Sequence, residues 1–134
     1  MKERDAFKTH GLRAWIMCTI ALAFAGLALA AEAEIPTVDG HLGSCSRDFT
    51  VWDQYHRPIY NARISVLIRY GALGLHRMSL EVGTDSEGRA RVTGLPEKTK
   101  KPLEFKITSG QSSRQLMLDM TTDCKASVDV NLTP

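Results

Sequence analysis

Apolar and polar residues alternate with a period of two in seven short stretches between Phe49 and Leu132. Successive side chains of a strand point to opposite faces, so this period predicts half-buried β-strands. No stretch after the N-terminal leader has a helical period. The alternate apolar positions are Phe49 and Val51; Ile64, Val66, Ile68 and Tyr70; Met78, Leu80 and Val82; Ala90 and Val92; Leu103, Phe105 and Ile107; Leu116, Leu118 and Met120; and Val128, Val130 and Leu132.

Turn-forming residues separate these stretches. Segments 54–58, 86–88, 94–102 and 109–111 carry glycine, proline or short polar residues, which favour reversals of the chain. A single open sheet would leave its apolar face in water, so two sheets must close on each other. The sequence therefore predicts an all-β fold, a seven-stranded antiparallel β-sandwich over residues 45–134.

Residues 1–31 have a different character. A basic start, with Lys2, Arg4, Lys8 and Arg13, precedes an uncharged and mostly apolar run over residues 14–31. Ala28-Leu29-Ala30 fits the small-x-small pattern at which signal peptidase cleaves, as does Ala31-Glu32-Ala33. This predicts a signal-peptide helix over residues 1–31. The alternative is an uncleaved membrane anchor, because the run approaches the length of about 20 residues that a span needs.

Charge and composition also change after this leader. The whole chain has a formal net charge of +2, but beyond residue 30 thirteen Lys and Arg face thirteen Asp and Glu. A neutral domain has no general attraction to a phosphate backbone, so nucleic acid is not an expected partner. Segment 32–44 is polar and contains Pro36, Gly40 and Gly43, which predicts a flexible leader into the sandwich.

Two cysteines, Cys45 and Cys124, lie beyond the leader, whereas Cys18 lies inside the apolar run. In an exported domain such a pair predicts a disulfide, which would close a loop of roughly 80 residues and stabilise the fold by about 4 kcal/mol. The alternatives are two free thiols or a metal pair, although there is no CxxC motif and His41 is the only histidine nearby in sequence. The first and last predicted strands follow these cysteines and should lie side by side or close.

The turn residues between Phe49 and Pro96 resemble those of the carboxypeptidase regulatory-like domain. The matching positions are Asp53, Pro58, Ile59, Ala62, Thr84, Asp85, Gly88, Gly94, Leu95 and Pro96. The resemblance implies a transthyretin-like (prealbumin-like) sandwich over residues 45–134, with a carbohydrate-binding-like fold. It also implies a module that binds, spaces or stabilises and does no chemistry. Segment 71–77 is longer than that pattern expects, and a charged segment, 97–101, replaces its Gly-x-Tyr.

Aromatic residues crowd the first predicted turn. Trp52, Tyr55 and Tyr60 lie there, with His56 and Arg57 between them. Aromatic rings stack on sugars and anchor protein interfaces, because they bury much area at little entropic cost. We therefore expect a candidate binding surface made of Trp52, Tyr55, His56 and Tyr60. The alternative is that these rings only cover a corner of the sandwich.

Motifs for catalysis or metal binding are missing from the sequence. His41, His56 and His76 are far apart, and no pair has HxH or HxxxH spacing. There is no GxSxG elbow and no HExxH. Hydroxyisourate hydrolases, which share a transthyretin-like sandwich, end in Tyr-Arg-Gly-Ser, and this chain does not. We expect no catalytic residue, no metal and no cofactor, and hence no enzyme.

A basic loop with Lys98, Lys100 and Lys101 suits an anionic lipid or an acidic partner, or simply solvent. Taken together, these patterns predict an exported, non-enzymatic module in the periplasm or outside the cell, with a protein or glycan partner or a structural role in the cell envelope. The alternative is a membrane-tethered accessory domain whose uncleaved N-terminal helix holds it at the bilayer.

Overall fold

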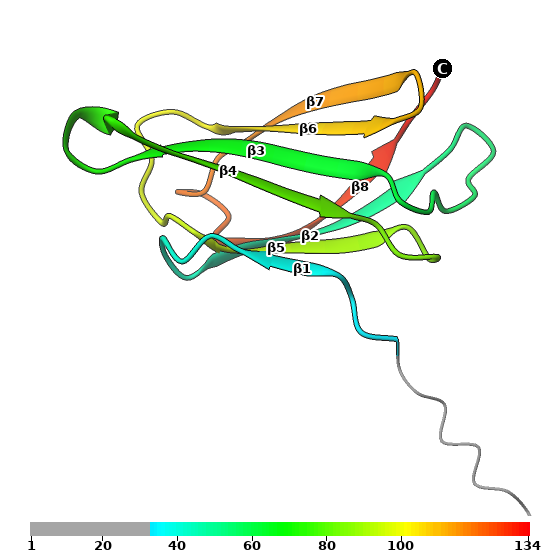
Figure 1. Ribbon diagram of the computed structural model, residues 1–134, viewed down its shortest axis with the longest axis horizontal. Helices are drawn as coiled ribbons and strands as arrows, with labels where there is room; N and C mark the ends of the chain where they lie inside the picture. Colours follow the sequence, from blue (N-terminus) through cyan, green and yellow to red (C-terminus); the bar gives the residue numbers. More distant parts are fainter. Residues whose placement is uncertain (1–32) are drawn as a thin grey trace, which may run out of the picture. The chain divides into compact units, whose positions relative to one another are not determined.

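Eight strands form two four-stranded sheets that pack face to face (Figure 1). The computed structural model describes residues 33–134, and the predicted signal-peptide helix lies outside them. A short 3-10 helix, η1 (Ala72–Gly74), joins the third strand to the fourth. The strands are β1 (Thr37–Asp39), β2 (Cys45–Trp52), β3 (Arg63–Tyr70), β4 (His76–Gly83), β5 (Arg89–Leu95), β6 (Leu103–Ser109), β7 (Ser112–Leu118) and β8 (Lys125–Asn131).

The first sheet has the order β1-β5-β2-β8 and the second the order β4-β3-β6-β7. The predicted sandwich is confirmed, but seven strands was wrong, because the described residues contain an eighth, β1. Strand β1 lies in segment 32–44, and its three residues are too few to show an alternating pattern. Antiparallel pairing throughout was also wrong, since β1 runs parallel to β5 and β8 runs parallel to β2.

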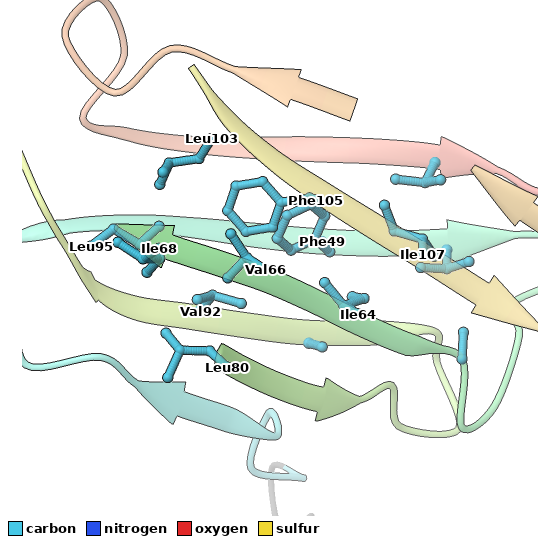
Figure 2. Close-up of a cluster of buried hydrophobic side chains, with 14 of the residues drawn as sticks. Phe49, Ile64, Val66, Ile68, Leu80, Val92, Leu95, Leu103, Phe105 and Ile107 are labelled. Carbon is cyan, nitrogen blue, oxygen red and sulfur yellow. The ribbon is translucent and has the colours of Figure 1, made fainter. Parts of the chain in front are cut away.

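The core lies between the sheets and is built from the alternate positions that the sequence indicated. Phe49 and Phe105 come from different sheets, and their ring centroids lie 5.1 Å apart at the centre of the core (Figure 2). Ile64, Val66 and Ile68 of β3 are buried beside them. Burial of each such side chain stabilises the fold by roughly 1.5–3 kcal/mol. Residues 33–134 thus form a compact unit with its own hydrophobic core, which is what an independently folding domain requires.

The disulfide between Cys45 and Cys124 is formed, as predicted. Cys45 begins β2, and Cys124 immediately precedes β8. The two strands then run side by side in continuous register, from Ser46 opposite Lys125 to Trp52 opposite Asn131. The prediction that the first and last predicted strands lie together is therefore confirmed.

Arg47 is the charged exception within the core. It occupies a core-facing position of β2 between Cys45 and Phe49 and is only 2% exposed. Its guanidinium donates to the carbonyl oxygens of Ser46, at 3.1 Å, and Asp119, at 3.3 Å. Burial lowers the pKa of Arg47 because it disfavours the charged form, and the charge of Asp123 acts in the opposite direction. The guanidinium ties β2 to the β7–β8 loop at the disulfide end.

Within residues 33–134, no helix has the length and hydropathy that crossing a membrane requires. The apolar run over residues 14–31, for which the sequence leaves a cleaved signal and an anchor open, lies outside the described part of the chain.

Candidate binding surface

Two turns with the same hydrogen-bond pattern support the candidate surface. One spans Asp53–Arg57 between β2 and β3, and the other spans Asp85–Arg89 between β4 and β5. In each turn the aspartate backbone N–H donates to the carbonyl of the arginine four residues later, at 2.9 Å. In each turn the aspartate Oδ1 accepts from the N–H groups two and four residues later. The chain thus uses one five-residue turn, Asp-x-x-x-Arg, twice.

Asp53 organises the turn that carries the aromatic residues. Its Oδ1 accepts from the backbone N–H of Tyr55 at 2.8 Å and of Arg57 at 2.9 Å, and its Oδ2 lies 2.9 Å from Arg57 Nε. The backbone hydrogen bond from Arg57 is the largest influence on this carboxyl, and it holds the pKa of Asp53 below its usual range. The side chain of Arg57 and the N–H of Tyr55 act in the same direction. The charged form of Asp53 therefore holds the turn together.

The fourth position of each turn has a left-handed backbone. Gly88 takes this position in the second turn with φ 74°, and a Cβ there would lie 2.5 Å from the carbonyl oxygen of Val51. His56 takes the same position in the first turn with φ 58°, although glycine is the residue that adopts this region freely. The imidazole of His56 stacks on Trp52, with centroids 4.5 Å apart and an interplanar angle of 10°.

Thr84 fastens the two loops to each other. Its buried hydroxyl, in a residue only 3% exposed, donates to the carbonyl of Ile59 at 2.6 Å and accepts from the N–H of Ala62 at 2.8 Å. The backbone N–H of Thr84 also donates to the carbonyl of Ala62 at 3.0 Å. This bridge fixes segment 59–62, which contains Tyr60, to the start of the β4–β5 turn.

The four predicted surface residues differ in their exposure and in their contacts. Trp52 is half-buried on the outer face of β2 and pairs with His56. Tyr55 is 69% exposed, and the guanidinium of Arg57 lies 5.0 Å from its ring centroid, in a cation–π contact. Tyr60 is 73% exposed and belongs to neither pair. Trp52 at the end of β2 and the three predicted loop residues thus form one stacked pair, Trp52–His56, and leave two exposed tyrosines, of which only Tyr55 contacts Arg57.

A small pocket of about 190 Å³ opens beside Tyr55 and Arg57. Its walls come from the β2–β3 loop, the β6–β7 hairpin and the C-terminal segment, which meet at one end of the sandwich (Figure 1). The volume is below the roughly 300–1,000 Å³ of pockets that enclose a ligand, so it suits one protruding group. The lining residues are Asp53, Gln54, Tyr55, Arg57, Ile59, Ser109, Ser112, Leu132 and Pro134.

The chemistry of this pocket is that of recognition. Ser109 and Ser112 offer hydroxyls, Tyr55 offers a ring face, and the lining includes no histidine that could activate a serine. Nowhere in residues 33–134 do three or more His, Cys, Asp or Glu side chains gather as a metal site would require. The expectations of no metal, no cofactor and no catalytic residue remain predictions.

Sequence reasoning found the aromatic residues but missed their partners. Ser109 and Ser112 line the pocket from more than fifty positions along the chain, and no local pattern links them to Tyr55. The repeated Asp-x-x-x-Arg spacing was present in the sequence, as Asp53-Gln54-Tyr55-His56-Arg57 and Asp85-Ser86-Glu87-Gly88-Arg89. That repeat was the signal that could have linked Arg57 to Asp53 in a defined turn.

No protein-family model matches the chain, and no curated protein matches it. Among solved structures, a 9R-lipoxygenase from Cyanothece PCC8801 is similar over 76% of this chain and 18% of its own, with 16% identity and a TM-score of 0.46. BcpA, the major pilin subunit of Bacillus cereus, is similar over 68% and 30%, with 9% identity and a TM-score of 0.47. Catechol 1,2-dioxygenase from Acinetobacter sp. ADP1 is similar over 75% and 59%, with 13% identity and a TM-score of 0.45. This chain spans less than two thirds of each, and scores below 0.5 establish neither a family nor a function.

Proposed function

We propose that this chain is an exported, non-enzymatic β-sandwich module that binds a protein or glycan of the cell envelope through the aromatic end of the sandwich. The observation that carries the proposal is the placement of exposed Tyr55 and the Tyr55–Arg57 pair beside the pocket. Exposed aromatic and arginine side chains are the groups most often found at the centre of binding interfaces.

The rigidity of the turn supports binding. Asp53 holds the backbone at Tyr55 and Arg57, and Thr84 holds the segment on either side of Tyr60. A preformed loop loses little conformational entropy when a partner docks, so more of the contact energy remains as affinity. A ring face beside hydroxyls and a guanidinium suits a sugar ring or a protruding polar side chain.

The family and the compartment form part of the proposal. The positions that resemble the carboxypeptidase regulatory-like pattern include Asp53, Thr84, Asp85 and Gly88, and each has a defined role in the turns or in the bridge between them. This is what a transthyretin-like member of that family would need from them. The disulfide is typical of oxidising compartments, which supports a periplasmic or secreted location.

Binding of the oxidised Ala33–Pro134 unit to a panel of envelope proteins and polysaccharides tests the proposal. A Trp52→Ala, Tyr55→Ala double variant should bind its partner at least about tenfold more weakly, as expected when central aromatic contacts are removed. Met117→Ala is the matched control, because Met117 is exposed on the outer face of the other sheet. Equal binding by the double variant and the control would remove this surface from consideration.

A further inference from the structure

The end of the sandwich opposite the aromatic turn carries a second unusual feature. The β3–β4 hairpin projects there, far from the β2–β3 loop and the C-terminus (Figure 1). Its tip exposes two leucines, Leu73 at 83% and Leu75 at 76%. These are the most exposed large hydrophobic side chains of the described residues. Neither belongs to the candidate binding surface.

The hairpin tip has contacts of its own. The rings of Tyr70 and His76 face each other across its base, with centroids 5.3 Å apart. Inside it, the N–H of Gly74 donates to the carbonyl of Gly71 at 3.2 Å. Leu73 has φ 61°, a region that large side chains rarely adopt. This backbone conformation exposes the Leu73 side chain to solvent, and contact of an apolar side chain with water is unfavourable.

Two arginines lie in the same hairpin as the leucines. Arg69 and Arg77 are direct cross-strand neighbours below the tip, and both are exposed. Neither makes an ion pair with another described residue, and segment 54–80 contains no Asp or Glu. The β5–β6 loop, which carries Lys98, Lys100 and Lys101, lies at the same end of the sandwich (Figure 1). Like charges opposite each other on a sheet are destabilising. An anionic partner would offset the repulsion between Arg69 and Arg77.

We propose that the hairpin tip, defined by Leu73 and Leu75 with Arg69 and Arg77, docks on the surface of an anionic phospholipid bilayer. The leucines enter the boundary between headgroups and acyl chains, and the two guanidinium groups bind lipid phosphates. Attraction of the neighbouring lysines to the negative surface adds to the binding. This contact is separate from the predicted N-terminal helix, and it adds the two leucines and two arginines of the hairpin to the basic loop that the sequence already linked to anionic lipid.

A bilayer fits the tip better than a protein partner does. A stable protein interface buries more than about 1,000 Å² in total, which two leucines and two arginines do not supply alone. A projecting loop with two aliphatic side chains penetrates a deformable interface and needs no matching hollow. Apolar side chains next to basic side chains are typical of segments that bind anionic lipid surfaces.

Vesicle flotation with the oxidised Ala33–Pro134 unit tests the proposal. The unit should float with vesicles of phosphatidylglycerol and phosphatidylcholine, and not with phosphatidylcholine alone. A Leu73→Ser, Leu75→Ser variant should bind about tenfold more weakly, because the apolar contact is lost. An Arg69→Gln, Arg77→Gln variant should lose about fivefold in vesicle affinity for each arginine removed. High salt should weaken vesicle binding by the wild type.

Leu67→Ser is the matched control, because Leu67 is an exposed leucine of β3 that lies outside the tip. It should float like the wild type, and circular dichroism should show that every variant keeps its strands. Failure of the wild type to float would overturn the proposal. So would full binding by the leucine variant together with loss in a Lys98→Gln, Lys100→Gln, Lys101→Gln variant, since that result means a general charge attraction.

Two further measurements separate the bilayer from other occupants. Gel filtration without vesicles should show the same elution for the wild type and the leucine variant, and a dimer formed only by the wild type would overturn the proposal in favour of a second copy. In the full-length chain, hydrogen exchange with anionic vesicles should show new protection at residues 71–77 and none at residues 53–60. Protection at 53–60 alone would also overturn it.

Discussion

Thr84 illustrates how much one buried hydroxyl does in this sandwich. Its Oγ1 satisfies the N–H of Ala62 and the carbonyl of Ile59, two backbone groups that no strand pairing reaches. A threonine in a turn motif would ordinarily be explained by its backbone conformation. Here the side chain itself joins two loops that lie more than twenty residues apart in sequence.

Thr84→Val should therefore lower the free energy of unfolding by about 1–3 kcal/mol, because it keeps the shape and leaves the buried N–H of Ala62 without an acceptor. Thr84→Ser keeps the hydroxyl and should lose less. Urea denaturation of the three proteins measures the difference. A valine variant as stable as the wild type would mean that water or another group takes over the bridge.

Arg47 poses the opposite question, because its charge is buried and its acceptors are two neutral carbonyls. Removing such a charge from the interior often costs nothing, since desolvation offsets most of the gain from hydrogen bonds. We expect Arg47→Met to leave the free energy of unfolding unchanged or to raise it by about 1 kcal/mol. Thermal unfolding at neutral pH tests this, and a loss of more than about 2 kcal/mol would show that Arg47 holds the β7–β8 loop in place.

At the scale of elements, the two Asp-x-x-x-Arg turns behave as one device used for two purposes. The β4–β5 copy has glycine at its left-handed position and packs closely on Val51. The β2–β3 copy has histidine there and uses its ring to cover Trp52. The same backbone therefore serves packing in one place and surface presentation in the other.

The β2–β3 turn should loosen in acid. The pKa of Asp53 is depressed in the folded state, so its stabilising effect is complete above the ordinary aspartate pKa of about 3.9 and is lost as the pH falls through the lower folded-state value. The amide hydrogens of Tyr55 and Arg57 should then exchange faster, relative to other loops, below that range. Asp53→Asn keeps an oxygen acceptor but cannot ionise, so NMR should show the dependence in the wild type and not in this variant.

The pattern of side chains predicted which segments are strands better than it predicted how they pair. The alternating positions of β6, and those of β3 apart from the half-buried Tyr70, are buried as expected. Strand β7 ends at Leu118, however, and Met120 reaches the core from the following loop. The parallel pairing of β2 and β8 was implicit in the cysteines. Each cysteine lies at the start of its strand, so a bond between them brings both starts to the same end.

The candidate binding surface was predictable only where its residues are neighbours in sequence. Trp52, Tyr55, His56 and Tyr60 lie within nine positions, so their proximity needed no knowledge of the fold. The serines of the β6–β7 hairpin reach the pocket only because the two sheets are stacked. A local sequence pattern does not show which distant segments meet in this way.

At the scale of the whole molecule, the disulfide holds the β2 and β8 starts together across 79 positions of the sequence. A Cys45→Ser, Cys124→Ser variant should lose about 2–4 kcal/mol of stability, because the unfolded chain regains the entropy of an open loop. Guanidinium unfolding with and without reductant gives the same comparison in the wild type. Equal stability in both states would mean that strand pairing alone closes this end.

Cleavage of a signal peptide within residues 1–33 is a prediction from the sequence. Cleavage at the small-residue sites should give a mature protein that begins near Ala31 or Glu34. Mass spectrometry of protein recovered from the exported fraction measures this directly. An intact Met1 would contradict cleavage and favour the tethered alternative.

The hairpin tip and the aromatic turn occupy opposite ends of strands that are seven or eight residues long, which corresponds to about 25 Å. Occupying one end therefore leaves the other sterically open. If Leu73 and Leu75 insert into a bilayer, Tyr55 and Tyr60 lie at the end of the sandwich that is away from the membrane. A partner bound there would be held at a set distance from the bilayer, with no conformational change in the sandwich.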